Sequence, residues 1–331
     1  MPYKLKDSVR HKFDKKFYNV RDWKKYDENL RNRGSLTIWF SEEAIASWNS
    51  VRPSKMKRGG QQKYSDLAIE TAHTLRLVYK KPLRQTEGFL ASIVQFMKVD
   101  LDIPDHTTLS RRAATVKLST SSKSPRLTSS SGSNVVIVDS TGIKVFGEKE
   151  WMNLKHGTRL RKVWRKLHLA IDEDGEILSA TLTTHDESDT SQVAELLSKI
   201  ESPIDEFIGD AGGYDHKTTY DAIEARERTQ GRPILTIIPP NLGFQKEQDS
   251  DSTHRKKNIK LLEDRGRARW QKVTDYERRA LAENTMHRYK STLGNKLTSR
   301  STANQNTEIQ IGVKILNKMN GLCRPKAQKA A

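Results

Sequence analysis

The sequence predicts a mixed α/β fold, in which a mixed sheet is flanked by helices and is preceded by an all-α region. Three observations predict it. Apolar side chains recur at helical spacing between residues 65 and 116, short apolar runs after residue 134 end in carboxylates, and helical stretches separate those runs. The segment 119–133 contains eight serines and little that can pack, so we expect it to link the two parts.

The charge of the chain is strongly basic and unevenly distributed. The net charge is +18, and residues 1–130 hold 26 Lys and Arg against 13 Asp and Glu. Such an excess indicates a polyanionic partner, so we expect the front of the chain to hold DNA. A basic protein on a membrane surface is the competing interpretation, but the sequence has no long basic amphipathic helix to support it.

Cysteine usage and hydropathy exclude several classes of protein. Cys323 is the only cysteine, which excludes an internal disulfide and a zinc site with several cysteines. The sequence contains no run of about 18 apolar residues. We therefore expect a soluble, cytoplasmic protein without a membrane partner, and the resemblance described below implies a bacterial protein associated with the nucleoid.

Residues 1–118 form the predicted N-terminal DNA-binding domain. Helices are expected at about 65–81, 85–97 and 106–116. A tight turn before a short basic last helix is typical of a helix-turn-helix, whose last helix enters the major groove. That helix would offer hydroxyl and guanidinium groups to phosphates and base edges, from Thr107, Thr108, Arg111 and Arg112. A three-helix bundle with a solvated basic face is the alternative.

Residues 134–322 form the second predicted domain. The apolar run before Asp139 indicates a buried strand that ends in this carboxylate, and residues 140–142 are expected to turn the chain into another strand. A later strand ends in Asp210 and is followed by glycines, which permit close backbone approach to a ligand. A basic segment between the two acids can hold a phosphate backbone near them, through Lys155, Arg165 and Lys166.

The last third of the chain is expected to begin with a flexible basic insertion at 241–269. A helix follows at about 270–290, and one stripe of it carries Tyr276, Arg279, Glu283 and Lys290. A carboxylate held between cations is a good metal ligand, although a solvated charged helix with an Arg279–Glu283 pair is the alternative. A final helix that begins near Ile309 is expected to pack on the sheet, and residues 323–331 are expected to be disordered.

The spacing on the helix at 270–290 resembles a known signature. Tyr, two residues, Arg, three residues, Glu, six residues and Lys follow one another as in DDE-type transposases of bacterial insertion sequences, in particular the insertion-sequence-five-like group. The stretch 104–112 resembles the end of the N-terminal domain in that group. The predicted order of strands and helices after residue 134 matches the ribonuclease-H-like fold.

The resemblance implies a catalytic site and its cofactor. It assigns catalysis and the binding of two Mg²⁺ ions, for which Mn²⁺ can substitute, to Asp139, Asp210 and Glu283. It also implies that DNA phosphate near the cut is contacted by Tyr276, Arg279 and Lys290. One departure from the family pattern is an additional residue before the next acid, which leaves Asp215 as an alternative second ligand.

The function implied by the resemblance is that of a DNA transposase. Such an enzyme binds double-stranded DNA at terminal inverted repeats, cleaves it with Mg²⁺ and transfers strands to target DNA, as a homodimer or a larger oligomer. Two alternatives remain open at this point. One is an inactive or co-opted transposase that acts as a sequence-specific DNA-binding protein, and the other is a ribonuclease-H-like nuclease for RNA hybrids or branched DNA.

Overall fold

A computed structural model describes residues 18–20, 22–50, 61–118, 134–145, 164–241, 252–322 and 327–329. The predicted serine-rich linker and the basic residue Lys155 lie outside these ranges. Within them, no helix combines the length and the apolar character needed to cross a membrane.

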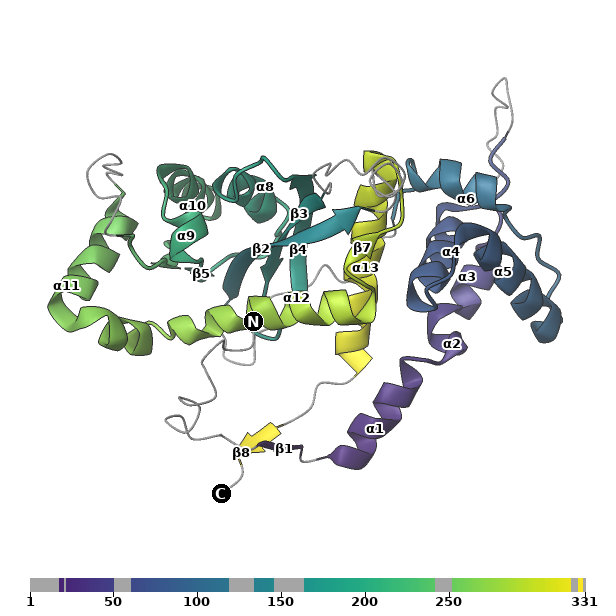
Figure 1. Cartoon of the computed structure of the whole chain (residues 1–331), viewed down its shortest axis with the longest axis horizontal. Helices are drawn as coiled ribbons and strands as arrows, with labels where there is room; N and C mark the ends of the chain where they lie inside the picture. The colour runs from purple at the N-terminus through teal and green to yellow at the C-terminus, as the bar shows by residue number, and fades with distance from the viewer. Residues whose placement is uncertain are drawn as a thin grey trace, which may run out of the picture.

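A mixed sheet forms the centre of the C-terminal part (Figure 1). Its strands lie in the order β4-β3-β2-β5-β6, and β7 pairs with the end of β2. The central strand β2 pairs antiparallel with β3 and parallel with β5. The strands are β2 (Val135–Val145), β3 (Trp164–Ile171), β4 (Ile177–Thr184), β5 (Glu206–Ile208), β6 (Leu235–Ile237) and β7 (Lys296–Leu297).

Helices cover both faces of this sheet. One face packs against side chains of α12 and α13, and the other packs against α8 and α10. Val135 and Val138 on β2 are therefore at most 1% exposed, as expected for a strand buried on both sides. The helices of this part are α8 (Val193–Ser198), α9 (Ala211–Tyr214), α10 (Lys217–Gln230), α11 (Thr253–Val273), α12 (Ala280–Thr292) and α13 (Thr302–Leu322). The predicted fold class, a mixed sheet flanked by helices, is confirmed.

The N-terminal region is helical, as predicted. Its helices are α1 (Trp23–Asn32), α2 (Leu36–Trp39), α3 (Glu42–Ala46), α4 (Asp66–Val78), α5 (Leu83–Met97) and α6 (His106–Ala113). The side chain of Asp105 caps the N-terminus of α6. It accepts hydrogen bonds, each 2.8 Å long, from the backbone N–H groups of Thr107 and Thr108. The two longest of these helices, α4 and α5, and the short basic α6 thus occupy the positions that their apolar spacing indicates.

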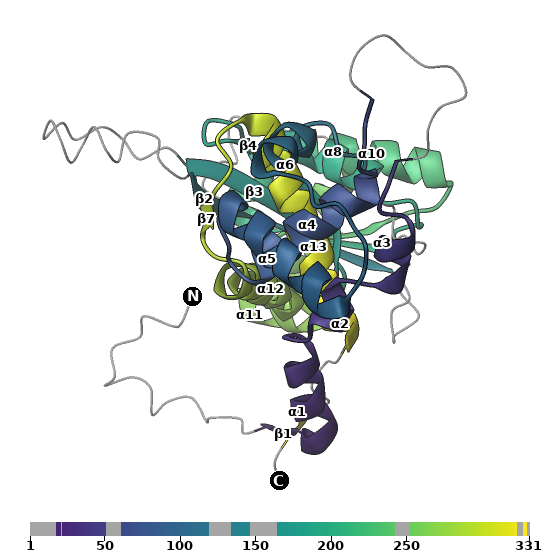
Figure 2. The same cartoon turned by 90° about the vertical axis from the view of Figure 1, so that its right-hand side faces the viewer.

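Helix α13 lies between the N-terminal helices and the sheet (Figures 1 and 2). Its sheet-facing side chains are Ile309, Val313 and Leu316, and those that pack among the N-terminal helices are Ile311, Ile315 and Met319. A helix that is apolar on opposite sides is buried on both. The prediction that the last helix packs on the sheet is confirmed, and the same helix also completes the N-terminal core.

Two expectations about the C-terminal third are wrong. Residues Thr253–Val273 form α11 and not a flexible loop, because Asn258 donates a 2.8 Å hydrogen bond to the Thr236 carbonyl on β6 and Trp270 is fully buried. The tail expected to be disordered contains β8 (Ala327–Lys329), which pairs antiparallel with β1 (Tyr18–Val20). Both errors have the same cause. The local sequence of these segments is polar and basic, which suggests disorder, whereas contacts with distant parts of the chain order them.

Close packing of α12 against α13 depends on Gly312. A Cβ atom at this position would collide with the hydroxyl of Tyr289 and would lie 3.0 Å from Leu293 Cδ1. We expect Gly312→Ala to lower the free energy of unfolding by about 1–3 kcal/mol, because overpacking forces neighbouring side chains to shift. Chemical denaturation followed by circular dichroism measures this quantity.

The matched control for this change is Gly321→Ala on the same helix. A Cβ atom there would meet nothing within 4 Å. Gly321→Ala should leave the stability unchanged or raise it by up to ~1 kcal/mol, the helix propensity gained on replacing Gly by Ala. Equal stabilities of the two variants would contradict the close-packing argument.

Candidate active site

The pairing register of β2 and β5 brings the first two predicted acids together. In this parallel pair Val135 lies opposite Glu206, and Ile137 lies opposite Ile208. Asp139 lies two residues after Ile137, and Asp210 lies two residues after Ile208. The two acids are therefore at the same height along the strands and on the same face of the sheet. That face is the one covered by α12 and α13.

The local structure around Asp139 differs from the prediction in one respect. Residues 140–142 do not turn the chain, and Asp139 lies inside β2, which continues to Val145. The reason is that β3 pairs with β2 without interruption from Ile137 to Lys144. The acid is therefore held by a continuous ladder on one side, while on the other side its parallel neighbour β5 has ended.

The predicted helix at 270–290 is interrupted. α11 ends at Val273, Asp275 adopts a left-handed backbone conformation with φ of 53°, and a 3₁₀ turn, η4 (Tyr276–Arg279), precedes α12. Trp270 and Tyr276 pack against each other across this break, with ring centroids 5.3 Å apart. Despite the break, each of the four predicted signature side chains contacts the acids, the strand that carries one of them, or another member of the signature.

The guanidinium of Arg279 contacts all three predicted acids. Its Nη1 lies 3.7 Å from Asp139 Oδ2, its Nε lies 3.8 Å from Asp210 Oδ1, and its Nη2 donates a hydrogen bond to Glu283. The Arg279 side chain is 24% exposed, and the acids are 18%, 44% and 38% exposed in the same order. Residues 139, 210 and 283 thus converge on one cation at a partly open surface.

The other two signature side chains fix the surroundings. Tyr276 donates a 2.9 Å hydrogen bond to Asp210, and Lys290 donates a 2.6 Å hydrogen bond to Thr141, two residues after Asp139. Burial raises the pKa of Tyr276, and the neighbouring Asp210 raises it further, so this hydroxyl keeps its proton and acts as a donor. Burial lowers the pKa of Lys290. Thr141 was not predicted as a site residue, since only the three-dimensional pairing reveals its partner.

Burial raises the pKa of Asp139 to about 6, against the opposing effects of the Ser140 backbone N–H and of Arg279. This value includes smaller contributions from Asp210 and Glu283, whose like-charge repulsion acts in the same direction as burial. The three carboxylates supply the hard oxygen ligands that Mg²⁺ prefers. In the described part of the chain, however, no three acidic, His or Cys side chains are placed to hold one metal ion as they stand. The carboxylate oxygens fit a divalent cation chemically, and the guanidinium of Arg279 lies among the three carboxylates.

Comparison with protein families decides the identity. Two family models, both described as a transposase DDE domain, match residues 31–148 and 130–318. The chain belongs to the DDE transposase family. Members of this family are DNA-cleaving, strand-transferring enzymes that generally use divalent metal ions, and their partner is DNA.

In this DDE transposase the alternative second acid, Asp215, has a different role. Its side chain is 1% exposed and receives hydrogen bonds from Tyr220 (2.8 Å), from the Asn241 backbone (2.8 Å) and from Arg255 (3.0 Å). A carboxylate with so many donors has few oxygen lone pairs left for a metal ion. Asp210, which is 44% exposed, is the better placed of the two.

The predicted basic contacts of β3 are engaged within the transposase. Lys166 donates to the Glu187 carbonyl (2.7 Å) and pairs with Asp189 at 3.2 Å. Arg165 donates to Gln305 over 3.3 Å. Neither side chain contacts the three acids, and Lys155 lies outside the described residues.

The predicted DNA-binding residues of α6 divide into two groups. The side chains of Thr107 and Thr108 bond to Asp105, and the exposed Arg111 donates to Thr107 over 3.2 Å. Arg112 instead points into the protein, where it donates to Asp66 at 2.6 Å and to the Tyr64 carbonyl at 2.9 Å. Arg112 therefore ties α6 to α4, whereas Arg111 remains exposed.

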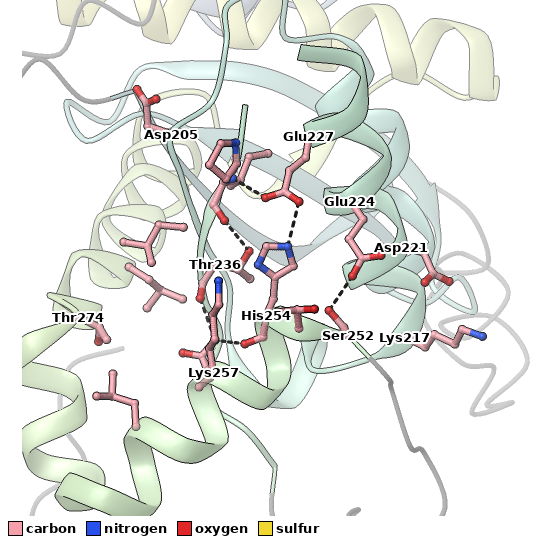
Figure 3. Close-up of a pocket in the computed structure, with 17 residues that line it drawn as sticks. Asp205, Lys217, Asp221, Glu224, Glu227, Thr236, Ser252, His254, Lys257 and Thr274 are labelled. Carbon is pink, nitrogen blue, oxygen red and sulfur yellow. Dashed lines mark hydrogen bonds and ion pairs between the residues drawn. The ribbon is translucent and has the colours of Figure 1, made fainter. Parts of the chain in front are cut away.

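A cavity of about 810 Å³ lies between β6, α10 and α11, away from the three acids (Figure 3). Glu227 lies 3.2 Å from His254 across this cavity, and Ser252 donates a 2.9 Å hydrogen bond to Glu224. The labelled acids around it are Asp205, Asp221, Glu224 and Glu227. Lys217 and Lys257 also line the cavity, and it contains none of the three predicted acids.

The two arginines of α6 allow a test of their different roles. We expect Arg112→Gln to lower the free energy of unfolding by about 1–2 kcal/mol, the scale of hydrogen bonds to charged groups reduced by the solvent exposure of Asp66. Arg111→Gln, next to it on the same helix, should change the stability by less than ~0.5 kcal/mol. Urea denaturation measures both variants, and equal losses would contradict the assignment.

Proposed function

We propose that this transposase cuts DNA at the terminal inverted repeats of an insertion sequence and joins the ends to target DNA, with Asp139, Asp210 and Glu283 as ligands of two Mg²⁺ ions. The observation that carries the proposal is the convergence of these three carboxylates, from β2, the end of β5 and α12, on one point. When bound, two such ions clamp the attacking and leaving oxygens of an in-line phosphoryl transfer.

The residues around the acids would orient them and the DNA strand. Tyr276 holds one oxygen of Asp210 through its hydrogen bond, and the Ser140 backbone N–H holds Asp139 over 2.8 Å. These contacts direct the remaining carboxylate oxygens toward the open side of the site. Arg279 lies beside the acids and Lys290 beside Thr141, and both can bind phosphate oxygens, Arg through two parallel hydrogen bonds.

A basic surface leads to this site along α11. Its C-terminal half exposes Arg265 before a kink at Gly266, then Arg267, Arg269 and Lys272, and it is followed after the break at Asp275 by η4. Arg267 is near enough to Tyr276 to lower the pKa of that hydroxyl against the larger effect of burial. We infer that DNA lies along this helix as it enters the site, and that the N-terminal helices with Thr107, Thr108 and Arg111 bind the repeat sequence.

The assembly and the location follow from the same chemistry. Two ends must be held together for joining to one target, so we propose a homodimer or a larger oligomer on DNA. Such an enzyme works where bacterial DNA is, at the nucleoid. Mn²⁺ should replace Mg²⁺, because both accept carboxylate and water oxygens in octahedral geometry.

The test is cleavage of a duplex that contains the inverted repeat flanking this gene, with Mg²⁺. We expect Asp139→Asn, Asp210→Asn and Glu283→Gln each to reduce the cleavage rate by more than ~100-fold, since even outer-shell partners of a metal site are worth ~10–100-fold. Chelation by EDTA should have the same effect. Glu277→Gln is the matched control. It removes an exposed carboxylate from η4, the 3₁₀ turn that carries Arg279, and should cleave normally.

The outcomes separate the three functions. Cleavage that survives Asp139→Asn or Glu283→Gln would refute the proposed metal site. Tight end binding by a folded protein that never cleaves would favour a co-opted DNA-binding protein. Cleavage of RNA hybrids or DNA junctions without any requirement for the repeat sequence would favour a nuclease.

A further inference from the structure

We propose that Arg279 is the internal counter-ion of the three acids in the metal-free protein, and that it must leave them before divalent cations can bind. A DNA backbone phosphate is the anion that draws the guanidinium away. The inference rests on the proposed function of Asp139, Asp210 and Glu283 as metal ligands, and it adds how DNA controls their occupancy.

The position of the guanidinium is the first observation. Three different nitrogens of Arg279 face three different carboxylates, at 3.7 Å for Asp139, at 3.8 Å for Asp210 and in a short hydrogen bond for Glu283. Only the contact with Glu283 is a hydrogen bond, and at 3.7 and 3.8 Å Arg279 interacts with Asp139 and Asp210 by charge alone. Three carboxylates this close would otherwise repel one another.

Competition for the same oxygens is the second step. The atoms that face Arg279 are Asp139 Oδ2, Glu283 Oε1 and Asp210 Oδ1. Asp210 Oδ1 also accepts the hydrogen bond of Tyr276, so the direct competition concerns Asp139 and Glu283. Mg²⁺ needs carboxylate oxygens at about 2.0–2.1 Å, and a guanidinium left among them would add like-charge repulsion.

The turn that carries Arg279 allows the side chain to exchange partners. Arg279 is the last residue of η4, its side chain is 24% exposed, and Asp210 and Glu283 are open enough for a strand of DNA to approach. A guanidinium matches a phosphate through two parallel hydrogen bonds, at least as well as it matches a carboxylate. Tyr276 and Lys290 keep their bonds to Asp210 and Thr141 when Arg279 moves.

The consequence is a coupling between DNA binding and metal binding. Without DNA, Arg279 lowers the affinity of the acids for a divalent cation. With DNA, the phosphate holds the guanidinium and the acids become available. By linkage, metal ions must raise the affinity for DNA by the same factor, and the protein does not assemble a competent site before its substrate is in place.

The neighbouring residue provides a matched control. Arg278 lies on the same turn and is 23% exposed, but its guanidinium donates to Glu206 at 2.5 Å and not to the three acids. Arg278→Gln removes the same charge at nearly the same place. It tests whether an effect of Arg279 depends on its contacts or only on the net charge of the surface.

The experiment is a Mn²⁺ titration of the full-length protein at pH 8 without DNA, with free Mn²⁺ measured by electron paramagnetic resonance. We expect Arg279→Gln to bind Mn²⁺ at least about tenfold more tightly than the wild type, because a positive charge near 4 Å from the ligands has been removed. Arg279→Lys, whose ammonium cannot reach all three acids at once, should be intermediate. Arg278→Gln should match the wild type. A duplex with an already cut element end should raise the Mn²⁺ affinity of the wild type more than that of Arg279→Gln.

Each result supports or overturns a specific claim. If Asp139→Asn abolishes Mn²⁺ binding but Arg279→Gln and Arg279→Lys bind no more tightly than the wild type, the counter-ion proposal fails and the metal site stands. If Arg278→Gln gains as much affinity as Arg279→Gln, net charge explains the effect and the proposal also fails. If neither Asp139→Asn nor Glu283→Gln alters Mn²⁺ binding, the proposed function itself fails. Thermal unfolding of every variant by circular dichroism identifies any that do not fold.

Discussion

The parallel register between β2 and β5 is the constraint on which the active site depends. It sets two acids that are far apart in the sequence at one level and on one face of the sheet. The short β5 ends at Ile208, so the chain is free to leave the sheet just where Asp210 is needed. β2 continues past this level because β3 supports it, and the continuous ladder gives Asp139 a rigid backbone. A slip of one residue would move one acid to the opposite face.

The N-terminal helices and the sheet pack against each other through α13. Asn304 donates to the Ser110 carbonyl over 3.0 Å and Thr307 donates to the Ala113 carbonyl over 2.6 Å, so α13 holds the C-terminal end of α6. Glu308 on the same helix lies 3.6 Å from Arg76 in a buried ion pair. A buried pair of this kind specifies geometry more than it adds stability. The distance from the basic helix to the acids is thereby fixed by packing, which suits an enzyme that must read one part of a DNA end and cut another.

Much of this arrangement could be predicted from local sequence, and the failures have a common cause. The β-branched run before Asp139 and the apolar strand before Asp210 are strong local signals, and they located both acids. The prediction of a turn after Asp139 is wrong. The Ser-Thr-Gly sequence favours a turn locally, but pairing with β3, a long-range contact, keeps these residues in the strand.

The helical stripe correctly grouped Tyr276, Arg279, Glu283 and Lys290, but it could not show the break at Asp275. That break is stabilised by Trp270 packing on Tyr276, two residues whose contact depends on the whole fold. The pair between Arg279 and Glu283 could be foreseen from their spacing of four residues. The contacts of Arg279 with Asp139 and Asp210 could not, because they join elements more than sixty residues apart in the sequence.

The three carboxylates of the proposed site impose opposite requirements on the stability of the fold and on metal binding. Three carboxylates gathered without a counter-ion disfavour the folded state through mutual repulsion and, for Asp139, through burial. A fixed cation among them removes much of that cost, but a fixed cation also occupies the oxygens that the chemistry requires. A guanidinium on a short 3₁₀ turn resolves the conflict, because it balances the acids in the resting protein and has an equally good partner in the substrate. A lysine at the same position would bind as a single point charge and could not face three acids at once. In the proposed site, the metal-free state would therefore favour an arginine as much as the DNA does.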